Sequence, residues 1–486
     1  MRGLRRGLEP LALARLLAAR WTEAAAYAAS FAAVLLFARF SIERHRSFES
    51  NAFDFGFFDQ IIWNTAHGRF FQTTFVPYNF LGQHFEPVLL LFALAYRFGA
   101  GPETLLAVQS TLVAAAAIPL YYAVRRTTSS GVAGLTLAMA FLVSAPLHIA
   151  LDFDFHPELM GFFFVFLAGY YVVAERPRAA ILALLPLLLL KEDMPLVLVA
   201  FALVLYARGY RRHGMTLFGI AAVFSAAVVL IAMPLIRGGP SDLTQRYGYL
   251  VRESTVWSVA PHIVTRLAEH LSDGVARGFV RFESTLGFAA ILSPLALVAA
   301  APSILLAGLS EHPQQSRFDL HYVMAPLALS WVAAVIGMGD VARGRGVARL
   351  ARLGERARPI AALTVGAVVL VASIGTFAHA SAYSPLIDHS APSAAHQRVI
   401  REALAMVPDD ASVSAQGTLV PHLSHRAKVY EFPYLVGVEY AVVDPSLPIS
   451  GQARAAHYDG VLAGMTSRGY DEIFSRDGVR VFRRSR

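Results

Sequence analysis

Long apolar runs alternate with short polar segments over the first 380 residues of the chain. A helix that crosses a membrane needs about 20 apolar residues, and several runs approach that length. The stretch 179–207 has arginine on both flanks, so it predicts two short helices that meet near one face, and 284–309 predicts a similar broken pair. The pattern predicts an α-helical polytopic membrane domain over residues 22–380 with about eleven spans. The remaining expected spans are 22–40, 105–124, 132–150, 159–174, 217–236, 321–338 and 360–379.

Arginines gather at the ends of these runs and set the expected orientation, because positive charge is enriched on the cytoplasmic side. Residues 1–21 are arginine-rich and carry no small-residue cleavage site, so we expect a cytoplasmic flank and not a signal peptide. The most basic loop, between 343 and 358, is expected inside as well. Alternate crossings then place four loops outside, namely 41–87, 151–158, 237–283 and 310–320.

The composition becomes that of a soluble domain from residue 381 onward. Because the last span is expected to run outward, residues 381–486 are predicted to form a small extracytoplasmic α/β domain. The expected elements are a helix over 399–407, strands over 411–416 and 440–444, and a hairpin over 473–482 that turns at Asp477-Gly478.

Overall charge and motifs exclude several classes of protein. The net charge of +8 follows the arginines that flank the spans, so topology explains it better than a nucleic-acid partner. With no cysteine, disulfides and thiolate metal sites are excluded. The chain has no glycine-rich phosphate loop, nucleophile elbow or His-Glu-x-x-His helix, so nucleotide-driven transport and serine hydrolysis are unsupported.

Three polar clusters interrupt the apolar pattern, at 53–60, 152–158 and 191–193. Ionisable groups near membrane depth are costly unless they face water or a partner. All three clusters fall on the expected outer side, although the orientation was derived from arginines alone. This convergence predicts one shared external site.

The first cluster holds Asp54 and Asp59 among aromatic residues. A carboxylate against apolar rings has a raised pKa and can act as a general base. A spacing of five puts the two side chains about 140° apart on a helix, so we expect one catalytic and one structural carboxylate. The alternative is a polar helix cap in a loop.

The second cluster alternates polar and apolar positions, so an extended segment would turn four polar side chains to one face. Such a set suits Mg²⁺, Mn²⁺ or Ca²⁺, and a divalent cation is the one cofactor we consider. The alternative is an amphipathic loop at the membrane surface. The four candidate ligands are Asp152, Asp154, His156 and Glu158.

The third cluster, Lys191-Glu192-Asp193, has two interpretations. It is either an ion pair that caps a helix hairpin, or a cation for an anionic lipid phosphate with the acids orienting it. Other polar residues on the expected outer side are candidate substrate contacts, namely His84, Arg317, His321 and Tyr322.

These features resemble the glycosyltransferase-C superfamily of polytopic enzymes that use polyprenyl-phosphate sugars. The resemblance rests on Asp54 fourteen positions before Gly68, on the His-Pro-like segment 84–87, and on the Lys-x-x-Pro-like turn 191–195. Nearly the whole chain also resembles a family of bacterial and archaeal predicted membrane proteins of unknown function. The segments that carry this second resemblance are 53–65, 82–87, 154–158, 191–193, 321–322, 413–416 and 421–426.

The superfamily resemblance implies inverting transfer of a sugar from a polyprenyl-phosphate donor to an acceptor hydroxyl at the outer face of a bacterial plasma membrane. It implies Asp54 as the base, and Lys191, Arg317 or His321 as the positive charge for the leaving phosphate. The lipid tail would lie in a groove between spans among membrane lipids. The acceptor would be an envelope glycan, lipid or protein, which the C-terminal domain binds or covers.

Two other functions compete with transfer. Broken helices and buried charge also describe a transporter or lipid flippase, although the polar groups gather on one side and no inverted repeat is evident. The other alternative is a non-enzymatic envelope assembly protein whose C-terminal domain binds a partner.

Overall fold

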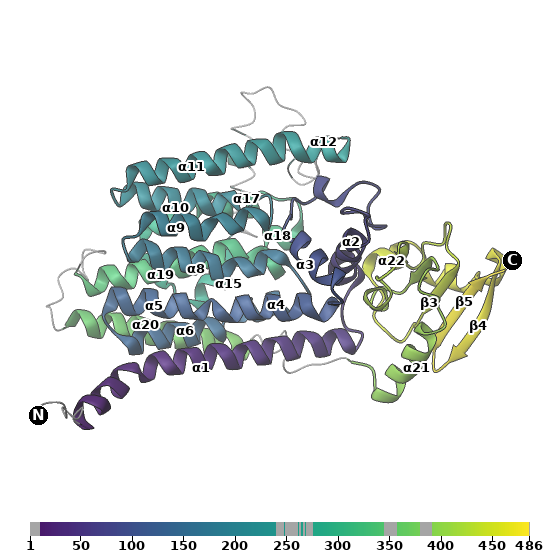
Figure 1. Ribbon diagram of the computed structural model, residues 1–486, viewed down its shortest axis with the longest axis horizontal. Coiled ribbons are helices and arrows are strands. Elements are labelled where there is room, and N and C mark those ends of the chain that lie inside the picture. The colour runs from purple at the N-terminus through teal and green to yellow at the C-terminus, as the bar shows by residue number, and fades with distance from the viewer. Residues whose placement is uncertain are drawn as a thin grey trace, which may run out of the picture.

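A computed structural model describes residues 10–239, 276–344, 357–379 and 391–485, together with 247, 261, 264, 265 and 268. Figure 1 shows a bundle of long helices that lie side by side, with a small α/β domain at one end. Helix α1 (Pro10–Arg46) starts at the end of the bundle far from the domain, and the short helices α2 (Phe57–Ala66) and α3 (Leu89–Arg97) lie between the bundle and the domain.

The described bundle contains helices of very different lengths. By length and composition, six helical stretches in the described part of the chain can cross a membrane, and three shorter apolar ones accompany them. The helices are α1 (Pro10–Arg46), α4 (Pro102–Ala115), α5 (Ala117–Thr128), α6 (Gly131–Leu142), α7 (Ala145–Asp152), α8 (Gly161–Val173), α9 (Pro177–Leu184), α10 (Pro195–Ala207), α11 (Arg211–Ser225), α12 (Met233–Arg237), α15 (Ala276–Thr285), α16 (Pro294–Ala299), α17 (Ala301–Gly308), α18 (Pro313–Ser316), α19 (Met324–Ala342) and α20 (Ala357–His379).

Helix α19 forms the centre of the membrane domain. Its side chains are buried along almost its whole length, including the indole of Trp331. Small residues allow helices in this domain to approach closely, as is usual in membrane bundles. At Gly134 on α6, a side chain would come within 2.8 Å of the Tyr121 carbonyl oxygen on α5, so only glycine fits this crossing.

The expected class of fold, a polytopic helical membrane protein with a small C-terminal α/β domain, is confirmed. The break expected in 179–207 is present, since α10 starts at Pro195 after a turn at Lys191. Helix α1 continues to Arg46, beyond the expected end at residue 40. The stretch 310–320, expected to be an external loop, contains the four-residue helix α18 and leads by a 3-10 turn (Leu320–Val323) into α19. Most of the predicted loops 237–283 and 343–358 lies outside the described residues.

The C-terminal domain is a five-stranded mixed sheet with the order β2-β1-β3-β5-β4. The first three strands are parallel, with Val413 opposite both Val429 and Tyr440, and the β4–β5 hairpin turns at Asp477-Gly478 as predicted. The elements are α21 (Ala394–Leu404), β1 (Val413–Ala415), β2 (Val429–Glu431), β3 (Tyr440–Val443), α22 (Gly451–Ala455), α23 (Tyr458–Ala463), β4 (Tyr470–Arg476) and β5 (Val479–Arg484).

His396 ties α21 to this sheet through both nitrogens of its ring. Nδ1 lies 2.6 Å from Asp477 Oδ2, and Nε2 lies 2.6 Å from Asp444 Oδ2. The hydrogen bonds to the two carboxylates, first of all the one to Asp477, raise the pKa of His396 above its ordinary value of 6.5. The protonated ring therefore stabilises the folded domain.

This contact predicts a pH-dependent stability. A raised folded-state pKa gives its full stabilisation below the unfolded pKa, and this is lost as the pH rises through the folded value. We expect His396→Gln to lower the Tm at about pH 6 and to lower it less at about pH 9. Thermal unfolding of both proteins at the two pH values checks this. An equal difference at both would contradict it.

The segment 41–87, which was predicted to be an external loop, contributes to the core of the C-terminal domain. Phe48 and Ala52 are buried in the same cluster as Ile400, Val413 and Val420. At Gly56 a side chain would come within 3.0 Å of Val420, so this turn approaches the domain closely. The domain is thus packed onto the segment that carries Asp54.

Candidate functional site

Asp54 lies in a π-helical turn, Ala52–Gly56, that leads into α2. Helix α2 ends at Ala66, and Gly68 follows with φ of +82°. Burial, with the charge of Asp154 as a second cause, raises the pKa of Asp54 to about 8. Its Oδ1 lies 3.7 Å from Nε2 of His156. A half-buried carboxyl group with this pKa is a strong base once it has lost its proton.

The loop that carries His156 is held by three other segments. Arg44, near the end of α1, lies 2.9 Å from Asp152 and 3.5 Å from Asp154. The Asn51 backbone N–H donates to Asp154 over 2.8 Å. On α4, the Gln109 amide accepts from the His156 backbone N–H and donates to the Asp154 carbonyl oxygen. These contacts fix the position of His156 beside Asp54.

A chain of ionisable groups continues from His156 into the third cluster. His156 and His321 stack with their ring centroids 3.8 Å apart, and burial lowers the pKa of His156 to about 4. His321 Nε2 is 3.6 Å from Glu158, whose other partner is Lys191, with Nζ at 2.6 Å. Tyr322 adds its ring 5.9 Å from the Lys191 ammonium group. The structure thus brings the second and third clusters together.

The acids beside Lys191 have separate tasks. Glu192 accepts from His84 Nδ1 and from the Phe85 backbone N–H, both at 2.9 Å, and so holds the end of the first external segment. Asp193 faces a small cavity of about 30 Å³, lined also by Lys191, His321 and Tyr322. Burial raises the pKa of Asp193 to about 6. Lys191 thus lies at the wall of this cavity.

Two expectations for the site need correction. The segment 152–158 is not extended, because α7 ends at Asp152, Asp154 has φ of +65°, and Pro157 starts a 3-10 turn. Its acids face Arg44 and Lys191, and among the described residues no group of three or more His, Asp or Glu is placed to hold a metal ion. The predicted cation site is therefore not assembled. Arg317, one of the candidate substrate contacts, is exposed at the end of α18.

Asp59 has a different environment from Asp54. It is fully buried and accepts hydrogen bonds from Tyr96, at 2.5 Å, and from Ser424, with His425 Nε2 at 3.2 Å. Ser424 and His425 belong to the C-terminal domain, so Asp59 joins that domain to the membrane domain. We call this set the Asp59 clamp. Its geometry fits the predicted structural carboxylate of the pair.

Weakening the clamp is predicted to loosen the domain. Asp59→Asn replaces one of the two carboxylate oxygens, which accept from the three donors of the clamp, with an NH2 group that cannot accept a hydrogen bond. A buried group left without its hydrogen bond costs about 1–3 kcal/mol. With a protease site placed in 381–390, we expect the cleaved domain to elute with the wild-type membrane domain and to separate in Asp59→Asn. Asp459→Asn, an exposed change in the same domain, is the control. Co-elution of both variants would refute the assignment.

Several residues of the site were not singled out from the sequence. Arg44 follows an apolar run and looks like an ordinary charged flank, and Gln109 is a single polar residue within a span. Glu86 is fully buried beside Lys191 and its acids. The segment 421–426 was noted only as part of the resemblance. A polar residue within an apolar stretch, as at Gln109, is the one signal that points to such a contact.

Fold and site together define a multi-pass α-helical membrane protein with a carboxylate, histidine and lysine site next to a small α/β domain. The family model described as predicted membrane protein (DUF2079) matches residues 44–449. The match spans most of the chain, so the protein belongs to this family, as the second resemblance implied. No curated protein matches the chain.

One solved structure similar to the chain is a single-particle cryo-EM structure of the arabinofuranosyltransferase AftD from mycobacteria. The two sequences are 11% identical and the TM-score is 0.43. The similarity covers 93% of this chain and 40% of that chain, so the protein spans well under half of that neighbour's length.

Proposed function

We propose that the protein is a membrane glycosyltransferase that moves a sugar from a polyprenyl-phosphate donor to an acceptor hydroxyl, with inversion. The observation that carries the proposal is the connected series from Asp54 through His156 and His321 to Lys191. It places a base of raised pKa at one end and a cation at the other. Transfer from a phosphate requires both of these groups.

The proposed reaction assigns a task to each end of the series. Asp54 takes the proton of the acceptor hydroxyl as its oxygen attacks the anomeric carbon. The bond from that carbon to the phosphate oxygen breaks, and the phosphate leaves with the electron pair. Lys191 has three N–H donors, and among the described residues one of them reaches Glu158, so the ammonium group can also donate to the departing oxygens. His321 lies beside the same cavity and adds a further donor.

The surroundings of this series support a lipid-linked donor. The site lies where the bundle meets the domain, so a polyprenyl tail can stay in the membrane while its phosphate reaches Lys191. The positive-inside pattern supports a cytoplasmic N-terminus and an extracytoplasmic domain in a bacterial plasma membrane. The acceptor is an envelope glycan, lipid or protein.

A donor assay tests the proposal. Purified protein in lipid nanodiscs is incubated with polyprenyl-phosphate pentoses and hexoses together with an envelope extract, and mass spectrometry follows the donor. We expect loss of one sugar donor and release of polyprenyl phosphate. Movement of intact donor between leaflets of proteoliposomes, with no cleavage, would replace the proposal with a flippase.

A further inference from the structure

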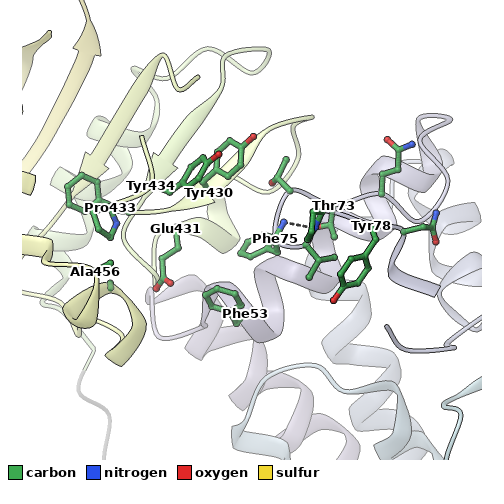
Figure 2. Close-up of a pocket in the computed structure, with 16 residues that line it drawn as sticks. Phe53, Thr73, Phe75, Tyr78, Tyr430, Glu431, Pro433, Tyr434 and Ala456 are labelled. Atoms are coloured by element: carbon green, nitrogen blue, oxygen red, sulfur yellow. Dashed lines mark hydrogen bonds between the residues drawn. The ribbon is translucent and has the colours of Figure 1, made fainter. Parts of the chain in front are cut away.

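A cavity of about 950 Å³ lies between the segment 53–79 and the C-terminal domain. Figure 2 shows Tyr430, Glu431 and Tyr434 of the domain together with Phe53, Phe75 and Tyr78 of the external segment. Such a volume lies at the upper end of the range of about 300–1,000 Å³ for ligand sites. None of the contacts in the proposed reaction uses this space, which we call the seam pocket.

Aromatic faces form much of the seam pocket wall. Tyr430 and Tyr434 stack with their centroids 4.6 Å apart, and Tyr434 is 47% exposed. Phe53, 42% exposed, meets Phe75 edge to face across the external segment. Exposed aromatic rings at a cavity are unusual unless something flat or apolar covers them. The pocket therefore offers ready surfaces for stacking.

The rest of the lining combines apolar residues with polar ones that are almost all uncharged. Side-chain amides and hydroxyls of Gln72, Thr73, Thr74 and Asn79 lie along one side. Glu431 stands at the other side, and its Oε1 has no hydrogen-bond partner among the described residues. None of the described lining residues is basic, so the lining does not suit a phosphate.

The walls of the seam pocket are fixed by contacts that need no ligand. Gln60 accepts from the Thr73 hydroxyl at 2.7 Å and from the Thr74 N–H at 3.0 Å, while its amide reaches the Arg426 carbonyl at 3.3 Å. The Thr74 hydroxyl also bonds the Val429 carbonyl oxygen. A preformed wall lowers the entropy cost of binding.

The position of the seam pocket follows a general rule for parallel sheets. Glu431 is the last residue of β2 and lies beside the end of β1, so the pocket opens at the carboxyl ends of parallel strands, where ligands commonly bind. At Gly417, which follows β1, a side chain would come within 2.8 Å of Glu431 Oε1. Glycine there leaves room for the carboxylate.

We infer that the seam pocket binds a neutral saccharide of several rings, with sugar faces on the tyrosines and hydroxyl groups on Glu431 and the amide and hydroxyl wall. Aromatic faces carry negative partial charge and attract the polarised C–H groups of a sugar ring. Ser450 already donates to the Glu431 carboxylate, which lines the pocket and can accept a further hydrogen bond from a sugar hydroxyl. A nucleotide would stack as well, but its phosphate would find no cation among the described lining residues.

The seam pocket lies next to the proposed base, because a residue that lines the pocket directly precedes Asp54 in the sequence. Phe53 lines the pocket, and the next residue, Asp54, turns its carboxylate toward His156. Given the proposed function, on which this step rests, the saccharide is the acceptor. Its end would leave the pocket at Phe53 and bring a hydroxyl to Asp54.

Saturation-transfer NMR tests the inference on the full chain in phosphatidylglycerol nanodiscs, which carry no sugar headgroup. The probes are linear tetrasaccharides of glucose, galactose, mannose and arabinose, with choline as a probe for an aromatic cage. We expect ring protons of at least one tetrasaccharide to receive saturation. Tyr434→Ala should weaken that binding about tenfold, and Glu431→Gln about three- to tenfold.

The matched control is Glu439→Gln, an exposed change in the same segment that does not line the pocket. Unchanged affinity in both pocket variants, no bound tetrasaccharide, or binding of choline alone would each overturn the inference. The binding assay contains no sugar donor, so it is independent of the transfer assay. A protein that binds the saccharide but cleaves no donor would refute the proposed transfer, while the assignment of the pocket would still hold. If transfer occurs, Tyr434→Ala should raise the acceptor KM and leave kcat nearly unchanged.

Discussion

Asp54→Asn is expected to lower sugar transfer by about 10²- to 10⁴-fold, the range that a general base contributes. The reason is that asparagine has nearly the same shape but cannot take the acceptor's proton. In the wild-type protein, transfer should rise with pH through about 8, because the raised pKa of Asp54 sets the fraction of ionised base. Initial rates between about pH 6 and pH 9 measure both effects.

The control for this prediction is Asp340→Asn, which removes a carboxylate near Arg343 at the end of α19 and should leave transfer unchanged. The Tm of Asp54→Asn should stay close to that of the wild type, because the contact of Asp54 with His156 is long, at 3.7 Å. Full transfer in Asp54→Asn, at a pH where the wild type is active, would falsify the assignment of the base.

Lys191→Met is expected to abolish transfer and to destabilise the protein. It leaves Glu158 buried without its close partner, and breaking a buried ion pair by removing one member costs about 3–5 kcal/mol. The leaving phosphate also loses its nearest cation. Thermal unfolding in detergent and donor cleavage by mass spectrometry measure the two effects separately.

The double variant Lys191→Met/Glu158→Gln separates folding from chemistry. Removing both charges takes away the uncompensated carboxylate, so most of the lost stability should return. Transfer should remain absent because no cation is restored. A double variant that is both stable and active would assign Lys191 a structural role alone, as the capping ion pair considered from the sequence.

The helical architecture was predictable because it depends on properties that a sequence displays directly. Long apolar runs between arginine clusters fixed most of the expected spans, and the turn at Lys191 followed from arginines on both flanks of 179–207. Strand β2 was missed because three residues are too few to display an alternating pattern.

The partners of the polar clusters were harder to predict, because they depend on packing between distant segments. Alternation in 152–158 suggested an extended strand with a metal site, but Arg44 and Gln109 hold this loop in another shape. Neither residue differs from its neighbours in a way that a sequence pattern reveals. The same holds for Ser424, which lies 365 positions from its partner Asp59.

That separation has a consequence for how the protein is made. Asp59 leaves the ribosome early, whereas Ser424 and His425 follow only after every described membrane helix has been synthesised. During insertion the Asp59 carboxylate therefore lacks these two partners, and the surface formed by Phe48 and Ala52 is not yet covered by the C-terminal domain. Chains that stop early, or whose last domain fails to cross, would present that surface to proteases that remove incomplete membrane proteins. The contact between the two domains therefore forms only after the C-terminal domain has been synthesised.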